Sequence, residues 1–480
     1  MTKKERFKNK IKEVYTLISL VIAFVTAALI WYWNVAPGWV EGFFGYRTLT
    51  LVGIMFSIVY LFFAKMYDAH KIGLYRLQEL AFSQMLSFSI GDFCLFVATF
   101  FWFHNFSRIS LRFFLLGFVL QFTSIVLVTF ICNRLYARFD EPRKIMIVYG
   151  SQDYHRLLKK MKEKKYRYQI LGIYEDTTDP DTIFRTLRKC KDIYLCDVSE
   201  ELEKKVTIFC DAHRKDMHMS MDMSDLLKLS HEVSHTFDTP YLRNRKMPEA
   251  WYYAGVKRTA DIIIALLGIL ILSPILIITS ILIKAYDGGP VLYSQKRLTK
   301  DGRVFDIYKF RSMREDSENG VARLASKNDD RITPVGNVIR KLRIDELPQL
   351  FNILKNDMSV VGPRPERPEI AEQYEKEIPE FSLRLKVKAG LTGYAQVYGK
   401  YNTTPLDKLK LDLLYIAQRS VLFDLRIIFY TLKIVFIPES SEGVSEDQVT
   451  ALEGVRPPYE NLTECNLPVR GSDPLAEDEQ

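Results

Sequence analysis

The segment "KRTADIIIALLGILILSPILIITSILIK" (Lys257–Lys284) decides how this chain meets a membrane. Its apolar centre has the ~20 residues that a membrane-spanning helix needs, yet basic residues flank both ends. Because Lys and Arg favour the cytoplasmic side of a membrane, both ends are expected there. Ser273 and Pro274 lie at the centre, where proline removes a backbone donor and kinks a helix. We therefore predict a re-entrant helix over 258–284 that enters the membrane, bends and returns; a fifth true span with a proline kink is the alternative.

Four further apolar stretches precede this segment and predict an N-terminal four-helix transmembrane bundle over residues 1–140. The first stretch is too long for a cleavable signal and lacks a small-residue cleavage site, so we expect it to remain in the chain. Basic residues before the first stretch, between the second and third, and after the fourth place those loops in the cytoplasm. Asp92, inside the third stretch, is expected to bond within the bundle. The stretches are Val14–Trp33, Leu49–Ala64, Met85–Phe103 and Leu111–Cys132.

Residues 141–245 alternate between short apolar runs and charged helical stretches. The runs "KIMIVYG", "ILGIYED" and "DIYLCDV" are typical of strands, and their alternation with helices predicts a small, doubly wound βαβ domain of the Rossmann-like kind. Dinucleotide binding would need G-x-G-x-x-G after the first strand, where the sequence offers only Gly150. We therefore expect a degenerate domain with a structural or regulatory role.

Other classes of protein fit less well. The six cysteines show no C-x-x-C spacing, which argues against a zinc ribbon or a disulfide framework. The stretch from His231 to His235 matches H-E-x-x-H, which on a helix places two zinc ligands on one face. It ends at Pro240 after little more than one turn and has no obvious third ligand, so we interpret it as a chance match. The net charge of +8 is modest for 480 residues, and no nucleic-acid partner is expected.

Cations gather beyond Tyr286. The stretch "GRVFDIYKFRSM" predicts a strand that places Lys309 and Arg311 on one face, because side chains alternate along a strand. Two cations on one face suit an anion, although an edge strand that uses charge against aggregation is the alternative. Arg364 lies between two prolines in "GPRP", where a rigid backbone presents a guanidinium suited to phosphate oxygens. Phosphate is the ligand that these cations predict.

Two adjacent acids, Asp345 and Glu346, follow a basic run in "RKLRIDELPQLFNIL". Helical spacing of the apolar residues predicts a helix from about Asp345, with Pro348 in its first turn. Asp345 is then a candidate N-cap, because free backbone donors and the macrodipole stabilise a carboxylate there and also favour phosphate. Capping does not require Glu346. If Asp345 attacked a phosphorus atom, Glu346 could hold a divalent cation that neutralises charge on the leaving group.

The C-terminal segments differ in character. Residues 406–436 are amphipathic and suit either the membrane interface or a protein core. Residues 438–480 are acidic and polar and predict a disordered tail.

From Lys257 to about Phe436 the chain resembles the bacterial sugar transferase family, the monotopic polyprenyl-phosphate phosphoglycosyl transferases. With the four N-terminal stretches and the βαβ domain, it looks like the large form of that family. The resemblance implies a mixed α and α/β membrane protein whose α-rich catalytic domain, 251–437, carries the re-entrant helix and interfacial amphipathic helices. It rests on an ordered set of motifs: Lys257-Arg258 with Asp261, Ser273-Pro274, "YKFRSM", "DELPQLFN", "MSVVGPRP" and "LTGYAQ".

The resemblance implies transfer of a sugar 1-phosphate from a UDP-sugar to undecaprenyl phosphate, with release of UMP, at the cytoplasmic face of the bacterial inner membrane. Asp345 becomes the nucleophile that forms a covalent phosphosugar intermediate, and Glu346 helps to bind Mg²⁺. Direct attack by the lipid phosphate with Asp345 as a base is the alternative. A hexose, glucose or galactose, is the favoured sugar, and a homodimer is expected by analogy. Candidate phosphate- and substrate-binding residues are Lys309, Arg311, Arg343, Arg364 and Gln396.

Two positions depart from the family's usual pattern. Thr299 stands where glycine is usual, and Ala389 stands where proline is usual. Both positions shape the backbone, so they put loop geometry in question while the acids and arginines are intact. The rival functions are a membrane-tethered nucleotide-sugar dehydratase, which would need a glycine-rich loop and a Tyr/Lys pair that we do not find, and a nucleotide-sugar-binding regulator of polysaccharide synthesis.

Overall fold

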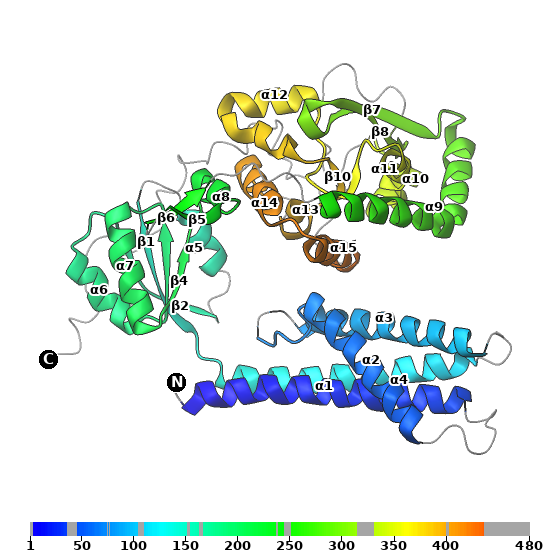
Figure 1. Ribbon diagram of the computed structural model, residues 1–480, viewed down its shortest axis with the longest axis horizontal. Coiled ribbons are helices and arrows are strands. Elements are labelled where there is room, and N and C mark those ends of the chain that lie inside the picture. The colour runs from blue at the N-terminus through cyan, green and yellow to red at the C-terminus, as the bar shows by residue number, and fades with distance from the viewer. Residues whose placement is uncertain are drawn as a thin grey trace. The chain divides into compact units, whose positions relative to one another are not determined.

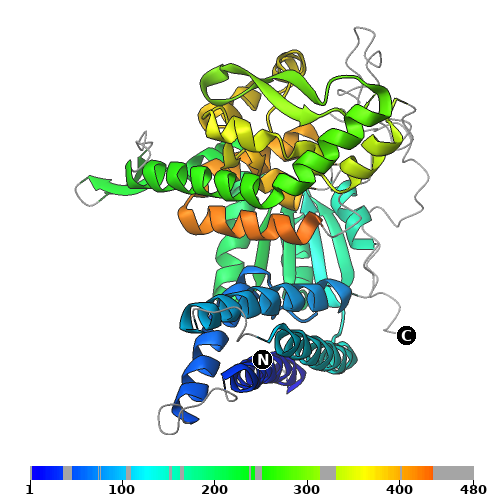
Figure 2. The same ribbon diagram turned by 90° about the vertical axis from the view of Figure 1, so that its right-hand side faces the viewer.

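The computed structural model describes the chain in two compact units (Figures 1 and 2). The first comprises Met1–Arg245 with Ile428–Phe436, and the second comprises Lys246–Ile427 with Ile437–Gln480. The predicted tail, 438–480, lies outside the described residues. The described residues are 3–35, 46–73, 75, 77–103, 110–150, 154–162, 167–236, 239–243, 251–313, 331–399 and 403–435.

Long apolar helices open the first unit, as the N-terminal stretches predict. They pack on a shared core that includes Ala27, Phe56 and Phe88, while large side chains such as Leu51 and Leu115 are exposed. Each is long and apolar enough to cross a membrane. The helices are α1 (Lys3–Val35), α2 (Tyr46–Met66), α3 (Leu77–Phe103) and α4 (Leu111–Phe139).

Asp92 bonds within these helices, as expected. Its Oδ1 accepts a hydrogen bond of 3.0 Å from Gln121 Nε2, and both residues are buried. The same Nε2 also donates to Thr26 Oγ1 at 3.1 Å. The polar side chains of three helices thereby bond to one another inside an apolar bundle.

A parallel sheet in the order β2-β1-β3-β4 confirms the predicted βαβ series. Its strands are β1 (Arg143–Tyr149), β2 (Tyr168–Glu175), β3 (Asp192–Cys196) and β4 (Asp216–Met219), and its helices are α5 (His155–Lys162), α6 (Pro180–Lys189), α7 (Glu200–His213) and α8 (Met223–Lys228). Side chains of α6 and α7 pack with Met146 and Ile193 on one face, and Figure 1 shows α5 on the other side. From β1 the chain first adds β2 on one side of β1 and then β3 and β4 on the other side. Because each crossover is right-handed, this change of side places helices on both faces of the sheet.

The H-E-x-x-H match lies on a strand. β5 (Glu232–Thr236) pairs antiparallel with β6 (Thr239–Arg243), and His231 precedes β5. Because the helical spacing is absent, the two histidines do not share a helical face. Over the described ranges, no group of three or more His, Cys, Asp or Glu side chains could hold a metal ion.

α9 (Trp251–Asp287) opens the second unit and bends along its length (Figures 1 and 2). It is also long and apolar enough to cross a membrane. Pro274 lies inside it and cannot donate to the carbonyl of Leu270, four residues earlier. Ser273 Oγ donates to that same carbonyl at 2.8 Å. The serine thus satisfies the acceptor that proline leaves, which matters where water is absent.

The amino-terminal end of α9 is anchored by buried polar contacts. Asp424 accepts hydrogen bonds from Tyr253 Oη (2.9 Å), Lys257 Nζ (2.8 Å) and Tyr415 Oη (2.8 Å). Arg258 donates to the carbonyls of residues 353 (2.8 Å) and 354 (3.0 Å), at the C-terminal end of α11 (Gln349–Leu354). The Lys257-Arg258 motif therefore fixes α9 to the rest of its unit.

The remainder of the second unit is built from short elements. β8 confirms the predicted strand, and Arg311 follows directly after its end. The elements are β7 (Leu292–Leu298), η3 (Lys300–Gly302), β8 (Val304–Phe310), α10 (Pro334–Lys341), η4 (Ile344–Glu346), α11 (Gln349–Leu354), β9 (Ser359–Val361), α12 (Pro368–Glu377), η5 (Pro379–Lys386), β10 (Gly390–Thr392), α13 (Tyr394–Tyr398), α14 (Pro405–Gln418) and α15 (Val421–Val435). β7 and β8 pair antiparallel, and β9 and β10 pair parallel.

Candidate active site

The acidic pair lies on a short 3₁₀ turn, η4, between α10 and α11. Arg343 precedes the turn in the left-handed conformation (φ 55°) and redirects the chain. α11 begins only at Gln349, with Pro348 at its N-cap position. The expectation that Asp345 caps this helix is therefore wrong, because the chain turn at Arg343 and the proline set the helix start later. Both acids are free for other partners.

Glu346 is held by two cations from elsewhere in the unit. Its Oε1 accepts hydrogen bonds from Arg364 Nη2 at 2.7 Å and from Lys309 Nζ at 3.3 Å. The Glu346 side chain is only 12% exposed. Burial by itself would raise the pKa of Glu346, but the charges of Arg364 and Lys309 outweigh burial and hold that pKa well below its usual range. Glu346 is thus an ionised carboxylate in a largely buried setting.

Asp345 has the opposite electrostatic character. Burial and the neighbouring charge of Glu346 raise its pKa, and the charges of Lys309 and Arg340 offset part of that rise. Adjacent acids whose pKa values are pushed apart are typical of carboxylates with different chemical roles. Asp345 is therefore a poorly solvated carboxylate beside cations, which suits attack on a phosphorus atom.

The structure brings only some of the predicted cations to this pair. Lys309 and Arg364 contact Glu346, and the charge of Arg343 helps to lower the pKa of Glu346. Burial lowers the pKa of Lys309 itself, against the opposing influence of Glu346. These three cations therefore place positive charge beside the acids, and their assignment to phosphate stays a prediction.

Arg311 and Gln396 lie in other surroundings. Arg311 is buried against Gly289, where a Cβ atom would approach its Nη1 to 1.9 Å, so a larger residue at 289 would displace that guanidinium. Gln396, on α13, donates through Nε2 to the carbonyl of Leu391 at 3.4 Å. Their assignment to substrate stays a prediction.

Three further side chains lie near the site, of which the sequence indicated only Arg340, as part of the basic run before the acids. Arg340 lies close enough to lower the pKa of Asp345. Arg297 and Arg384 bind the backbone beside Arg364, at 3.1 Å and 2.9 Å. Their partners lie 68 and 20 residues away along the chain, so no local pattern could have identified them.

The two departures from the family pattern lie against each other. Thr299 Oγ1 accepts a hydrogen bond of 3.2 Å from the backbone N–H of Ala389 and donates one of 2.9 Å to the carbonyl of Asp357. Proline at position 389 would have no N–H, and glycine at position 299 would have no acceptor. In this chain the two departures thus supply a donor and an acceptor to each other.

The acidic pair suits a divalent ion that substrate phosphates also bind. Mg²⁺ commonly takes one or two protein carboxylates and completes its shell with waters and phosphates. Asp345 and Glu346 supply carboxylates, and Oε1 of Glu346 already accepts from two cations. In the part of the chain that the structure describes, no third acidic, His or Cys side chain joins them. The residues fit Mg²⁺ shared with a phosphorylated substrate and do not form an all-protein cage.

Fold and site together define a protein with helices apolar enough for a membrane and an acidic pair held beside cations. A family model described as bacterial sugar transferase matches residues 252–438. The "Exopolysaccharide production protein PSS" of Rhizobium leguminosarum bv. phaseoli is 40% identical over 186 residues, which are 37% of this chain and 92% of that protein. The chain belongs to the bacterial sugar transferase family.

Longer relatives match over a similar length of this chain. The "UDP-N-acetylgalactosamine-undecaprenyl-phosphate N-acetylgalactosaminephosphotransferase" of Aeromonas hydrophila is 45% identical over 186 residues, 38% of this chain and 44% of that protein. The "UDP-glucose:undecaprenyl-phosphate glucose-1-phosphate transferase" of Escherichia coli (strain K12) is 42% identical over 181 residues, 37% of this chain and 39% of that protein. The matched region thus covers less than half of either relative.

Proposed function

We propose that this protein transfers a sugar 1-phosphate from a UDP-sugar to undecaprenyl phosphate and releases UMP, as the first committed step of a surface polysaccharide. The observation that carries the proposal is the acidic pair of Asp345 and Glu346, beside Lys309 and Arg364. The relatives' printed names support both the donor class and the lipid acceptor. Of the sugars that those names leave open, we favour glucose or galactose.

The chemistry proceeds in two displacements. An oxygen of Asp345 attacks the phosphorus that bears the sugar, a new P–O bond forms to the carboxylate, and the bond to UMP breaks. An oxygen of the lipid phosphate then attacks the same phosphorus, which forms the sugar diphospholipid and frees the Asp345 carboxylate. Arg364 and Lys309 offer positive charge where phosphate oxygens gain negative charge. Mg²⁺ held by Glu346, when bound, would neutralise charge on the departing phosphate.

The bent α9 supports a reaction at the membrane surface. Its Ser273-Pro274 break and basic ends favour a helix that returns to the cytoplasmic side. A soluble donor and a lipid acceptor can then meet at one surface. We place the protein in the bacterial inner membrane, with α1–α4 as transmembrane helices and the catalytic domain facing the cytoplasm.

The experiment measures UMP release by purified protein from a panel of UDP-sugars, with and without undecaprenyl phosphate. A covalent intermediate predicts a burst of about one UMP per active site without lipid, and sustained release with lipid. Asp345→Asn should abolish both, whereas Asp301→Asn should change neither, because Asp301 is exposed and asparagine also adopts its left-handed backbone (φ 58°). Lipid-dependent release without a burst would favour Asp345 as a base, and no release from any donor would refute the UDP-sugar assignment.

A further inference from the structure

The segment that carries Arg364 is fixed through its carbonyl groups. Pro363 and Pro365 have no N–H, so this segment has few backbone donors of its own. Four consecutive carbonyls each accept a hydrogen bond instead. The bonds run from Gly390 N to Pro363 O (2.9 Å), Arg384 Nη2 to Arg364 O (2.9 Å), Arg297 Nη1 to Pro365 O (3.1 Å) and Leu298 N to Glu366 O (2.9 Å).

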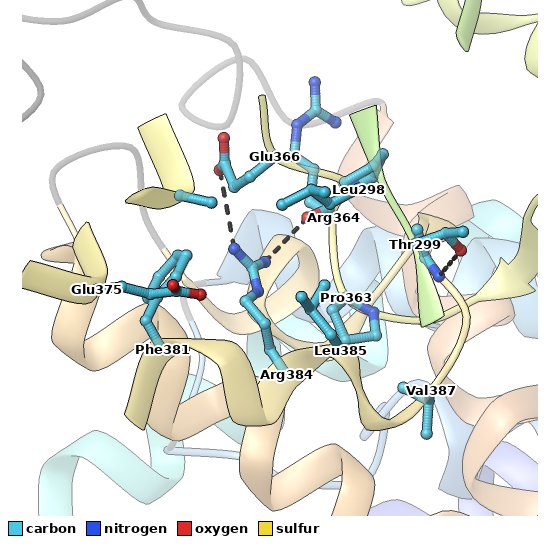
Figure 3. Close-up of a pocket in the computed structure, with 13 residues that line it drawn as sticks. Leu298, Thr299, Pro363, Arg364, Glu366, Glu375, Phe381, Arg384, Leu385 and Val387 are labelled. Atoms are coloured by element: carbon cyan, nitrogen blue, oxygen red, sulfur yellow. Dashed lines mark hydrogen bonds and ion pairs between the residues drawn. The ribbon is translucent and has the colours of Figure 1, made fainter. Parts of the chain in front are cut away.

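Arg384 contacts the main chain of Arg364. In Figure 3 the Arg384 guanidinium faces the main chain of Arg364, while the guanidinium of Arg364 points away. The Arg384 side chain is only 8% exposed, lies 4.0 Å from Glu366 Oε1 and has its guanidinium 4.9 Å from the ring of Phe381. It belongs to η5, which has no residue of the acidic pair. Among the described residues, Arg384 makes its hydrogen bond to the site at the Arg364 carbonyl.

Asp412 supplies a negative charge beside the buried guanidinium of Arg384. Its Oδ2 lies 2.7 Å from Arg384 Nη2, and Asp412, on α14, is 1% exposed. A buried ion pair is weak evidence for added stability, because desolvation offsets the attraction. The contact is an ion pair and not a hydrogen bond, because Asp412 Oδ2 has no hydrogen-bond partner among the described residues; it holds a planar guanidinium, which can direct an N–H at only a narrow range of positions. That position is occupied here by the Arg364 carbonyl.

We propose that Arg384 and Asp412 are positioning residues for Arg364. Asp412 orients Arg384, Arg384 fixes the Arg364 carbonyl, and the guanidinium of Arg364 is thereby held on Glu346 at 2.7 Å. The role rests on the proposed function, in which Arg364 binds the transferred phosphate. Neither Arg384 nor Asp412 contacts substrate in this role.

The test is a double-mutant cycle between Arg384→Gln and Arg364→Ala in the full-length protein. In the active protein, the cycle compares kcat and KM for UMP release. In the Asp345→Asn background, which should not turn over, it compares the affinity for UDP-glucose or UDP-galactose, whichever is the active donor. We expect Arg384→Gln to lower kcat/KM about 10- to 100-fold, as a displaced catalytic group does. With Arg364 already alanine, the same change should cost less than about twofold. Equal losses in both backgrounds would overturn the role, because Arg384 would then act independently of Arg364.

Two further variants guard against a folding defect. Arg384→Lys keeps the charge and one donor and should regain part of the lost rate, and Asp412→Asn keeps an acceptor and should lose less than Arg384→Gln. If Arg384→Gln does not fold, Arg384→Lys and Asp412→Asn are each combined with Arg364→Ala in its place. Arg303→Gln removes a guanidinium that is 57% exposed and paired with Asp357 at 3.1 Å, and should change the rate less than about twofold.

The outcomes separate the two proposals. A wild-type protein that releases no UMP from any UDP-sugar overturns the proposed function and this role with it. An active wild type with an additive cycle overturns the role of Arg384 alone. An active wild type with a non-additive cycle and unchanged melting temperatures supports both.

Discussion

The contact between Thr299 and Ala389 predicts a strong coupling between two positions 90 residues apart. Thr299 is 1% exposed and Ala389 is 4% exposed. Thr299→Gly leaves the buried N–H of Ala389 without its acceptor, which costs about 1–3 kcal/mol. The backbone freedom of glycine adds about 0.5–1 kcal/mol. We therefore expect Thr299→Gly to lower the free energy of unfolding by about 1.5–4 kcal/mol.

Ala389→Pro alone should also destabilise the protein. The proline ring carbon would replace the hydrogen that points at Thr299 Oγ1, which lies only 3.2 Å from the nitrogen. Such overpacking costs about 1–3 kcal/mol. In the double variant, glycine removes the obstructing hydroxyl and proline removes the donor, so neither penalty remains in full. The two changes should therefore couple favourably by about 2 kcal/mol.

The assay is thermal unfolding of the four proteins in detergent. A coupling of about 2 kcal/mol corresponds to a melting temperature about 4–8 °C above the additive expectation for a domain of this size. Thr299→Ser is the control, because it keeps the hydroxyl and should cost less than about 1 kcal/mol. An additive double variant, or Thr299→Ser as unstable as Thr299→Gly, would refute the compensation.

Two further predictions concern the site and α9. Lys309→Met removes a cation that lowers the pKa of Asp345, so the pKa of Asp345 should rise. The acid limb of the profile of kcat/KM against pH should then move to higher pH. If that limb does not move, Asp345 is not the group that titrates there. Ser273→Ala leaves the Leu270 carbonyl without its donor and should lower stability by about 1 kcal/mol, measured by thermal unfolding. Pro274→Ala restores a backbone donor, so Ser273→Ala should cost little in that background.

Local patterns predicted much of this architecture. The period-two alternation before Arg311 identified β8, and repeated apolar runs identified the parallel strands and the long helices. Each of these depends on residues two to four positions apart, which the sequence displays directly. The predicted N-cap at Asp345 is wrong for a related reason. The helical spacing of apolar residues begins near the acids, but the left-handed turn at Arg343 redirects the chain there.

The sequence by itself thus determined the family, the strands, the apolar helices and the identity of the acidic pair. Only the tertiary structure decided which cations meet Glu346, since Lys309 and Arg364 lie 37 and 18 residues away along the chain. It also decided that Thr299 accepts from Ala389 and that Arg384 supports Arg364. The physical reason is that secondary structure follows from neighbouring residues, whereas side-chain partners follow from how β8, η4 and the loops after β9 pack together.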